Sequence, residues 1–496
     1  MNHCKFLLKL YSYIFAVLFI CVVFFVKFLE AKTNEQDTVN KRIQLLLKNP
    51  SLKKVLYGID IVSIKKNMSL FSYRSNDLFS VASNMKLLTT AAALYYLGPD
   101  FEYKTSVETN CIITASGELN GDIIIKGSGD PNLSGRFYDG NILAVPESWA
   151  NAIINKGIHK ISGDIIADDS IFDRIYTNPN WPKDQLSEWY CAPSCGLSFN
   201  DNCVDITLIP DKKPGNVVTL LVDPDTSYFT IFNECVYTSN KKEHAYTIYR
   251  EPGTNQIFIK GKFWVNAPSE KRWVSVHNPA LYLATTFKET LEKHGIEVFG
   301  NVRLIDKRDS FSSNLERIAQ TTSTMEQTVL VTNKRSQNFY AEQILKTLGA
   351  HIKGKGNLKM GIEVLDDLLN KLGFHPEEYQ IEDGSGLSKG NKLSPKMITS
   401  LLVFMNKHPY GKVLYDSLPV PGIDEGLNRR FPSPRYENKI HAKTGTIAKV
   451  STLSGYVDTL NGDILAFSIL MNNFENLTDI QKIQNNLCRT LVDCYN

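Results

Sequence analysis

The stretch that decides the fold is Phe79–Gly98, FSVASNMKLLTTAAALYYLG, where a short apolar segment leads into a run of helix-forming residues. Apolar side chains recur at helical spacing after Ser83, and the alanine-rich composition favours a helix. The following Gly98-Pro99 pair predicts the end of that helix. We therefore expect an apolar helix that begins at Ser83.

Ser83 has two interpretations. Its hydroxyl can cap the free N–H groups of the first helical turn, or it can serve as a nucleophile. Lys86 lies three residues later, on the same helical face, within reach of the Ser83 hydroxyl. A buried lysine beside another cation can lose its proton and act as a base, which favours the second interpretation.

Serine-x-x-lysine is a weak pattern by itself. It also occurs at Ser51/Lys54, Ser63/Lys66 and Ser239/Lys242. These three lie in polar or turn-rich contexts, and none opens an apolar helix. Only Ser83 has a context that buries the lysine, so the hydrolase interpretation depends on partners found elsewhere in the chain.

The composition indicates a globular, exported protein. A chain of 496 residues with 43% hydrophobic residues can form two or three domains with proper cores. The formal net charge of +3 falls to +1 without residues 1–31, so no basic face for nucleic acid is implied. Tyr13–Val26 is an apolar run preceded by two lysines, which is typical of a signal peptide, with a retained membrane anchor as the alternative. Either reading places the body outside the cytoplasm, in the periplasm or on the outer face of the cytoplasmic membrane.

Seven cysteines follow the export segment, an odd number. Cys191, Cys195 and Cys203 are near enough in sequence to pair, as are Cys488 and Cys494, but the connectivity stays open. Metal binding is disfavoured because neither a CxxC pair nor an HExxH motif accompanies them.

The rest of the chain falls into regions of different character. A β-hairpin precedes the Ser83 helix, and short β-rich pieces follow to about Asp309, with a Gly-Asp-Ile-Ile core repeated at Gly121 and Gly163. Trp181-Pro182 and Trp189-Tyr190 form an aromatic patch that we expect to pack against the core. Residues 279–295 predict an amphipathic helix. Helical patterning returns from about Leu315, and three antiparallel strands and a helix capped by Thr478 close the chain.

Two later segments supply partners for an acylated serine. Ser336-Gln337-Asn338 offers a hydroxyl and an amide two residues apart, and Lys443-Thr444-Gly445 lies on a predicted strand. The lysine provides charge, the threonine a donor, and the glycine close backbone approach to a ligand. Ser336 as a helix cap and Lys443 as a solvated strand residue are the plain alternatives. Three such elements in this order favour acyl transfer.

With these motifs the chain resembles the penicillin-recognising serine acyltransferases, and most closely the D-alanyl-D-alanine carboxypeptidase/endopeptidases of the class C low-molecular-mass penicillin-binding proteins. The resemblance covers nearly all of the chain after the export segment. It extends from SNMK, SQN and KTG to GSGDPNL, SFNDN, AEQILKTLG, DGSGLS and the terminal GYV strand.

The resemblance implies an α+β fold, in which a β-lactamase/transpeptidase-like domain with a five-stranded sheet flanked by helices carries a large β-rich insertion. The implied division is 1–31 as signal peptide or anchor, 32–104 and 310–496 as the split transpeptidase-like domain, and 105–309 as one or two inserted accessory domains.

The resemblance also implies the roles of individual residues. Ser83 is the acylated nucleophile and Lys86 its base, while Ser336 and Asn338 pass the proton and orient the peptide. The substrate-binding strand is formed by Lys443, Thr444, Gly445 and Thr446. Backbone N–H groups of Ser83 and Thr446 form the oxyanion hole. Neither metal nor cofactor is required.

The leading hypothesis is therefore a serine hydrolase that cuts at D-alanine in peptidoglycan stem peptides and is acylated by β-lactams. A serine β-lactamase is the enzymatic alternative, and a β-lactam sensor or wall-binding protein is the non-catalytic one. Nucleic acid is not an expected partner, whereas peripheral or N-terminal membrane association is compatible with the export segment.

Overall fold

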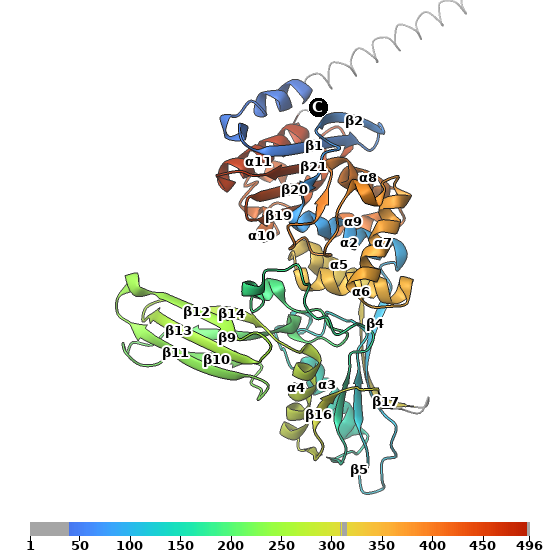
Figure 1. Cartoon of the computed structure of the whole chain (residues 1–496), viewed down its shortest axis with the longest axis vertical. Coiled ribbons are helices and arrows are strands. Elements are labelled where there is room, and N and C mark those ends of the chain that lie inside the picture. Colours follow the sequence, from blue (N-terminus) through green and yellow to red (C-terminus); the bar gives the residue numbers. More distant parts are fainter. Residues whose placement is uncertain (1–38, 308, 310–314, 494–496) are drawn as a thin grey trace, which may run out of the picture. The chain divides into compact units, whose positions relative to one another are not determined.

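A computed structural model describes residues 39–307, 309 and 315–493, which form two compact units (Figure 1). Among the described residues, the first unit combines residues 39–79 with Ser394–Val403 and with residues 419–493. The second unit combines Ser80–Leu393 with Phe404–Leu418. The predicted export segment and Cys494 lie outside the described residues. Within the described ranges, no helix is both long enough and apolar enough to span a membrane.

The first unit is built on an antiparallel sheet that joins both ends of the chain. Its order is β19-β20-β21-β1-β2. The strands are β1 (Leu56–Ser63), β2 (Met68–Tyr73), β19 (Ile440–Ile447), β20 (Val450–Asp458) and β21 (Ile464–Asn472). The predicted hairpin and the three predicted C-terminal strands are thereby confirmed, and β19 is an edge strand.

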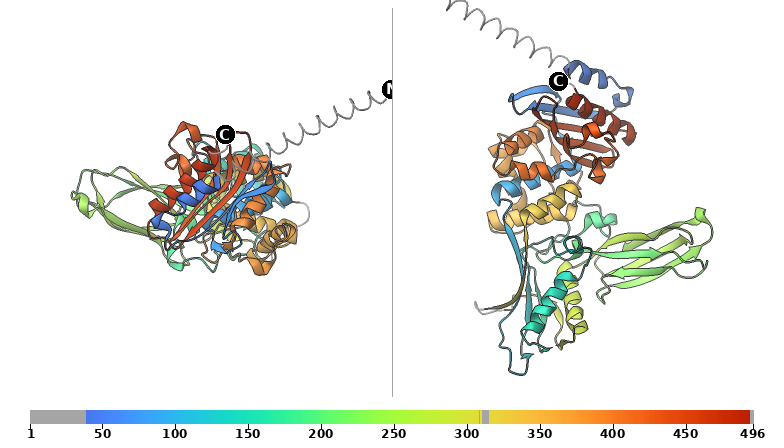
Figure 2. Two further views of the ribbon diagram at one scale, coloured as in Figure 1. Left: turned by 90° about the horizontal axis from the view of Figure 1, so that it is seen from above. Right: turned by 180° about the vertical axis from the view of Figure 1, so that it is seen from behind.

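Helices cover both faces of this sheet (Figure 2). Alternation along β20 places Leu453 and Val457 in one core with the buried face of α11 (Leu477–Asp493). Tyr456, on the opposite face, donates a hydrogen bond to the Leu402 carbonyl of α8. The unit's other helical elements are residues 39–46, η1 (Pro50–Leu52), α8 (Pro395–Asn406, shared with the second unit), α10 (Glu425–Asn428) and η9 (Pro434–Tyr436).

The second unit contains a helical layer around the SNMK segment. A 3-10 turn, η2 (Ala82–Asn84), precedes α2 (Met85–Tyr96), so the α-helix begins two residues after Ser83. The layer also holds α5 (Met325–Lys334), α6 (Asn338–Lys353), α7 (Leu358–Lys371) and α9 (Gly411–Ser417), together with η8 (Pro376–Glu378), β3 (Phe79–Ser80, across the unit boundary) and β18 (Lys392–Leu393).

Two antiparallel strands lead from these helices into the inserted region. β4 (Glu102–Thr109) and β17 (Glu316–Thr324) pair in a sheet of order β16-β8-β6-β4-β17. The remaining strands of this part are β5 (Glu118–Leu119), β6 (Ile123–Lys126), β7 (Lys160–Ile161), β8 (Ile165–Asp168), β15 (Glu297–Val298) and β16 (Val302–Leu304). The Gly-Asp-Ile-Ile repeats lie side by side, because β6 and β8 pair in parallel with Ile123 opposite Ile165.

The inserted region continues into a lobe of two three-stranded sheets, seen in light green in Figure 1. The sheets are β9 (Cys203–Ile209), β10 (Thr219–Asp223) and β14 (Glu270–Ser275), and β11 (Thr230–Thr238), β12 (Ala245–Arg250) and β13 (Gln256–Trp264). α3 (Ala144–Asn155) and α4 (Pro279–Lys293) share one hydrophobic core with these strands. Short 3-10 turns complete it: η3 (Gly135–Phe137), η4 (Lys183–Gln185), η5 (Trp189–Cys191), η6 (Asn200–Asn202) and η7 (Lys241–Glu243).

Some local expectations need correction. The sequence predicted α4 but not α3, because the latter lies between β-rich segments. Asn476, not Thr478, caps the last helix: its Oδ1 accepts hydrogen bonds from the N–H groups of Thr478 and Asp479 at 2.9 and 3.3 Å. The six cysteines among the described residues, Cys111, Cys191, Cys195, Cys203, Cys235 and Cys488, are all thiols.

Candidate active site

Ser83 lies in the tight turn that opens α2. The residue before it, Ala82, has a left-handed backbone (φ 45°), which is costly for a residue with a Cβ atom and is typical of functional turns. Gly386 fits against this turn because a Cβ atom there would collide with the Ala82 carbonyl. Ser83 is partly exposed, and its Oγ accepts a hydrogen bond from Lys86 Nζ at 3.1 Å.

Lys86 is fully buried and has three hydrogen-bond partners. Besides Ser83 Oγ, its Nζ contacts Asn338 Oδ1 at 2.6 Å and the Ser385 carbonyl at 2.7 Å. A charged lysine has three N–H groups, which match these three acceptors. A neutral amine donates to the two carbonyl oxygens and directs its lone pair at the Ser83 hydroxyl. Lys86 can therefore take up a proton from Ser83 without any movement of its neighbours.

Burial lowers the pKa of Lys86 to about 7, while the nearby carboxyl groups of Asp383 and Glu342 act in the opposite direction. The lowered pKa was expected from burial and from a neighbouring cation, Lys443, but the charged groups that act on Lys86 are carboxyl groups and not a cation. The dominant cause is the loss of solvent. A lysine with this pKa is substantially neutral at physiological pH, as a general base must be.

Asn338 is held in one orientation from its other side. Its Nδ2 donates to the Tyr190 carbonyl at 2.8 Å, and because a carbonyl only accepts, Oδ1 must face Lys86. Tyr190 belongs to the aromatic patch that we expected only to pack against the core. Trp181 in the same patch is buried, but its indole N–H also donates to Asp383 Oδ2 at 2.9 Å.

The DGSGLS loop supplies the Ser385 carbonyl, and two buried carboxyl groups fix its shape. Asp383 accepts hydrogen bonds from the N–H groups of Gly386 and Ser388 at 2.6 and 2.7 Å. Glu342 Oε1, from α6, accepts from the N–H groups of Gly384 and Ser385 at 3.0 and 2.9 Å. Burial raises the pKa of Glu342 to about 8, with a further contribution from Asp383.

The structure thus brings Ser83, Lys86 and Asn338 together. Ser336 lies two residues before Asn338, in a left-handed turn (φ 55°) between α5 and α6, which is not a helix-capping position because α6 has Gln337 as its N-cap. Glu342, Asp383, Ser385 and Tyr190 were not among the candidates. For Glu342, Asp383 and Ser385, the only sequence signal was their place in the AEQ and DGSGLS segments. Tyr190 acts through its backbone carbonyl, which has no signature in a sequence.

The second predicted motif lies in the first unit, on β19. Lys443 is buried, and its Nζ donates to the Thr444 carbonyl at 3.0 Å. Gly445 is buried, Thr444 is half-buried and Thr446 is exposed, at the edge of the sheet. An edge strand has backbone groups free to bind an extended peptide.

Across 39–307, 309 and 315–493, no group of three or more His, Cys, Asp or Glu side chains is arranged to hold a metal ion.

Comparisons with known proteins identify the family of the chain. The model of the D-Ala-D-Ala carboxypeptidase 3 (S13) family matches residues 39–492. The D-alanyl-D-alanine carboxypeptidase of Actinomadura sp. (strain R39) is 30% identical over 446 residues, which cover 87% of this chain and 80% of the relative.

Solved structures show the same fold. Penicillin binding protein 4 (dacB) from Haemophilus influenzae superposes with a TM-score of 0.78 at 22% identity, over 91% of this chain and 99% of the other. Its complex with a novel β-lactam gives a TM-score of 0.72 at 23% identity with the same coverage. The resemblance inferred from the motifs and the α+β fold are therefore confirmed, and the chain belongs to the D-Ala-D-Ala carboxypeptidase 3 (S13) family of serine-type hydrolases.

Proposed function

We propose that this protein hydrolyses peptidoglycan stem peptides at D-alanine through an acyl-enzyme on Ser83. The observation that carries this proposal is the contact between the buried Lys86 amine, whose pKa is about 7, and the Ser83 hydroxyl. In the neutral amine, the two N–H groups donate to Asn338 Oδ1 and to the Ser385 carbonyl. This arrangement generates a nucleophile at neutral pH.

In the acylation step, Ser83 Oγ attacks the carbonyl carbon of the penultimate D-alanine and its proton passes to Lys86 Nζ. The C–N bond to the terminal D-alanine then breaks, and the leaving amine takes up a proton by way of Ser336. Water hydrolyses the resulting ester and restores the Ser83 hydroxyl. Lys86 serves as the base in the first step because its neutral form is accessible near pH 7.

The KTG strand has the groups needed to hold the substrate. Lys443 would supply positive potential, Thr444 and Thr446 would bind the terminal carboxylate, and Gly445 would let the peptide lie close to β19. The backbone N–H groups of Ser83 and Thr446 would stabilise the oxyanion. The position of β19 at a sheet edge and the exposure of Thr446 support this assignment.

We also propose that the enzyme is exported, to the periplasm or to the outer face of the cytoplasmic membrane. Tyr13–Val26 would direct export, and a retained segment would make the protein membrane-anchored. Mass spectrometry of the N-terminal peptide from purified mature protein would distinguish cleavage from retention. Finding 1–31 on protein confined to the cytoplasm would overturn the assignment.

The decisive assay offers purified protein a stem pentapeptide, a cross-linked peptide dimer and penicillin. Release of D-alanine from the pentapeptide supports carboxypeptidase action, and cleavage of the dimer supports endopeptidase action. Slow release of a covalent penicillin adduct is expected. Rapid penicillin turnover without peptide hydrolysis would instead indicate a β-lactamase, and labelling without turnover of either substrate would indicate a sensor.

A further inference from the structure

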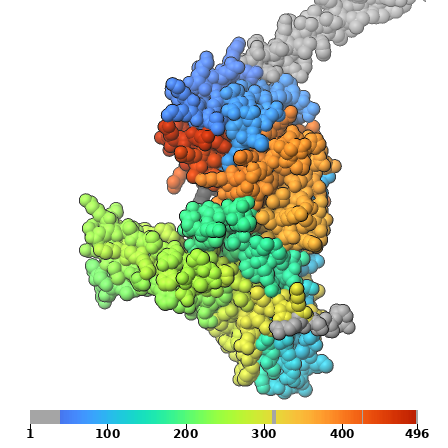
Figure 3. Space-filling view, in the orientation of Figure 1, coloured from blue at the N-terminus to red at the C-terminus, as the bar shows by residue number. Residues whose placement is uncertain are grey.

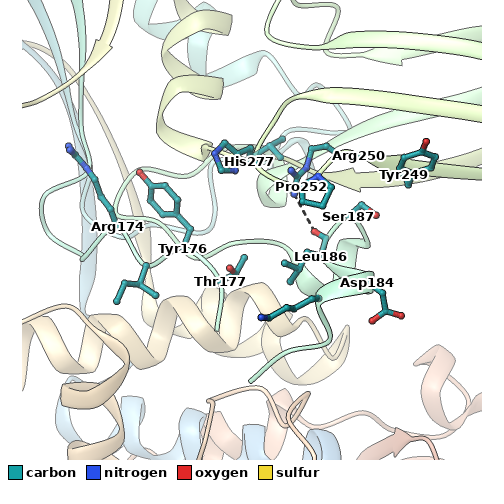
Figure 4. A pocket seen from close by; sticks show the side chains of 14 residues that line it. Arg174, Tyr176, Thr177, Asp184, Leu186, Ser187, Tyr249, Arg250, Pro252 and His277 are labelled. Carbon is teal, nitrogen blue, oxygen red and sulfur yellow. Dashed lines mark hydrogen bonds between the residues drawn. The ribbon is translucent and has the colours of Figure 1, made fainter. Parts of the chain in front are cut away.

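A second site is suggested by a cavity in the inserted part of the second unit, away from the Ser83 turn. The cavity has a volume of about 630 Å³. Its walls are the segment Arg174–Ser187 and the residues around the end of β12 (Figure 4). In the space-filling view, the teal-green surface of this segment adjoins the light-green surface of the β9–β14 lobe (Figure 3).

A buried cation forms part of the wall. Arg250 is only 7% exposed, and its guanidinium donates to the backbone carbonyls of Ser275, Thr254, Glu251 and Leu186 at 2.7, 2.9, 3.3 and 3.4 Å, which leaves one N–H group for a further partner. Among the described residues, no carboxylate forms an ion pair with it. These carbonyls orient the guanidinium and leave its full charge in a poorly solvated place, where it attracts an anion.

The other charges at the cavity add to this field. Lys183 is exposed and forms no ion pair within the described ranges, whereas Arg174 is already paired with Asp169. Asp184 is the one acidic side chain among the lining residues, and Figure 4 shows its carboxylate turned away from Arg250. Burial and the nearby Arg250 lower the pKa of His277, which is therefore a neutral hydrogen-bonding group at pH 7. The cavity therefore suits a carboxylate.

Aromatic and hydroxyl groups surround these cations. Tyr249 is 41% exposed and stacks on Phe258, with ring centroids 5.3 Å apart. Tyr176, Thr177 and Ser187 line the same space. Rings and hydroxyls beside a cation match a peptide that bears a carboxylate better than a bare inorganic anion.

The wall of the cavity is also connected to the candidate active site. Asn178 Nδ2 donates to the Glu382 carbonyl at 2.7 Å, Trp181 Nε1 donates to Asp383, and the Tyr190 carbonyl accepts from Asn338. One continuous segment therefore lines the cavity and contacts the groups that position Lys86.

We propose that this cavity binds a carboxylate of a second stem peptide of the same wall polymer, beside the stem peptide that is being cut. Arg250 and Lys183 would hold the carboxylate and Tyr249 would contact the peptide chain. This inference rests on the proposed function for the identity of the polymer. It predicts a preference for polymeric wall material over short peptides.

Binding can be measured by titration calorimetry with penicillin-acylated protein, in which the Ser83 site is blocked. The probes are a disaccharide-tetrapeptide fragment of peptidoglycan, the same fragment with its carboxylates amidated, and inorganic phosphate. The variants are Lys183→Glu and, as a matched control, Lys212→Glu, which changes an exposed lysine that does not line the cavity.

We expect one fragment per chain, with affinity at least about tenfold weaker for Lys183→Glu and for the amidated fragment, as loss of a charge-assisted hydrogen bond implies. Lys212→Glu should bind like the wild type. Equal affinity of Lys183→Glu and Lys212→Glu would overturn the proposal. Binding of phosphate as tight as that of the fragment would do the same and would indicate a general anion site.

A kinetic comparison separates this inference from the proposed function. On a short peptide ending in D-Ala-D-Ala, Lys183→Glu should match the wild type, and on isolated wall sacculi it should be several-fold slower. If wild-type protein neither hydrolyses the short peptide nor takes up penicillin, the proposed function fails. In that case, titration calorimetry on Lys183→Glu and Lys212→Glu without penicillin still shows whether the cavity binds the fragment.

Discussion

The Nζ atom of Lys86 lies 2.6 Å from Oδ1 of Asn338, although 252 residues separate the two in the chain. The predicted insertion, residues 105–309, lies between them in sequence. That region also supplies the Tyr190 carbonyl, which fixes the orientation of the Asn338 amide. The insert therefore contributes directly to the environment of the candidate base.

Asn338→Asp tests this relationship. A carboxylate would stabilise the Lys86 ammonium and could not donate to the Tyr190 carbonyl, so the pKa of Lys86 should rise. We expect penicillin acylation at pH 7 to slow by about tenfold or more, with partial recovery at higher pH. The measurement is the acylation rate across pH. Asn338→Ala, which adds no charge, should be acylated more slowly, but the midpoint of its acylation rate against pH should not move upward. An unshifted midpoint in Asn338→Asp would contradict the assignment of Lys86 as the base.

Ser83→Ala should abolish covalent penicillin labelling and peptide hydrolysis. The Ser83 hydroxyl is partly exposed and accepts one hydrogen bond, from Lys86, so unfolding free energy should change by no more than about 1 kcal/mol. Mass spectrometry after penicillin treatment and denaturant unfolding check the two parts. A labelled Ser83→Ala protein would show that another residue is the nucleophile.

Ser63→Ala is the matched control for Ser83→Ala, because Ser63 also lies three residues before a lysine, Lys66. Ser63 is buried and donates to Asp463 Oδ2 at 2.5 Å, whereas Oδ1 of the same carboxylate accepts from the Lys65 N–H. Loss of the hydroxyl should lower stability by about 1–3 kcal/mol, because Oδ2 would lose its buried hydrogen bond. Labelling of the folded protein should persist. Ser51 and Ser239 should be replaceable with labelling intact.

Lys86→Ala should slow acylation by about 10²- to 10⁴-fold, as expected for removal of a general base. In the wild type the neutral amine is the active form, and its pKa is about 7. The acylation rate should therefore fall as pH drops below about 7 and level off above it. Stopped-flow measurement of the acylation rate from pH 5 to 9 follows this decrease, which should be absent in Lys86→Ala. Near wild-type acylation by the variant would direct the search for the base to Ser336.

Glu342→Gln separates the two roles of the buried carboxyl group. Glutamine keeps an oxygen that can accept from Gly384 and Ser385. Because the pKa of Glu342 is about 8, its carboxyl is only partly ionised near pH 7, so glutamine removes a partial negative charge that opposes the lowering of the Lys86 pKa. The midpoint of the acylation profile should therefore move to lower pH, with a plateau within a few-fold of the wild type. An upward shift would contradict this electrostatic role. Glu342→Leu, which cannot accept the two N–H groups, should lose activity at every pH because the DGSGLS loop loses its support.

The sequence by itself indicated the family, the α+β class and the three motifs. Ser83 and Lys86 could be paired because their contact is local, at a spacing of one helical turn, and the apolar context of the helix predicted that the lysine would be buried. The hairpin, the three C-terminal strands and several helices followed from periodicity and turn residues in the same way.

Tertiary structure alone decided what surrounds Lys86. Glu342, Asp383, Ser385 and Tyr190 come from segments far apart in the chain, and two of them act through backbone carbonyls, which every residue possesses. Local patterns cannot specify such contacts, because they depend on how distant elements pack. The same reason explains why the burial of Trp181 could be predicted, but not the 37% exposure of Trp189 or the support that Tyr190 gives to Asn338. It also explains why the cation-lined cavity had no signal in the sequence.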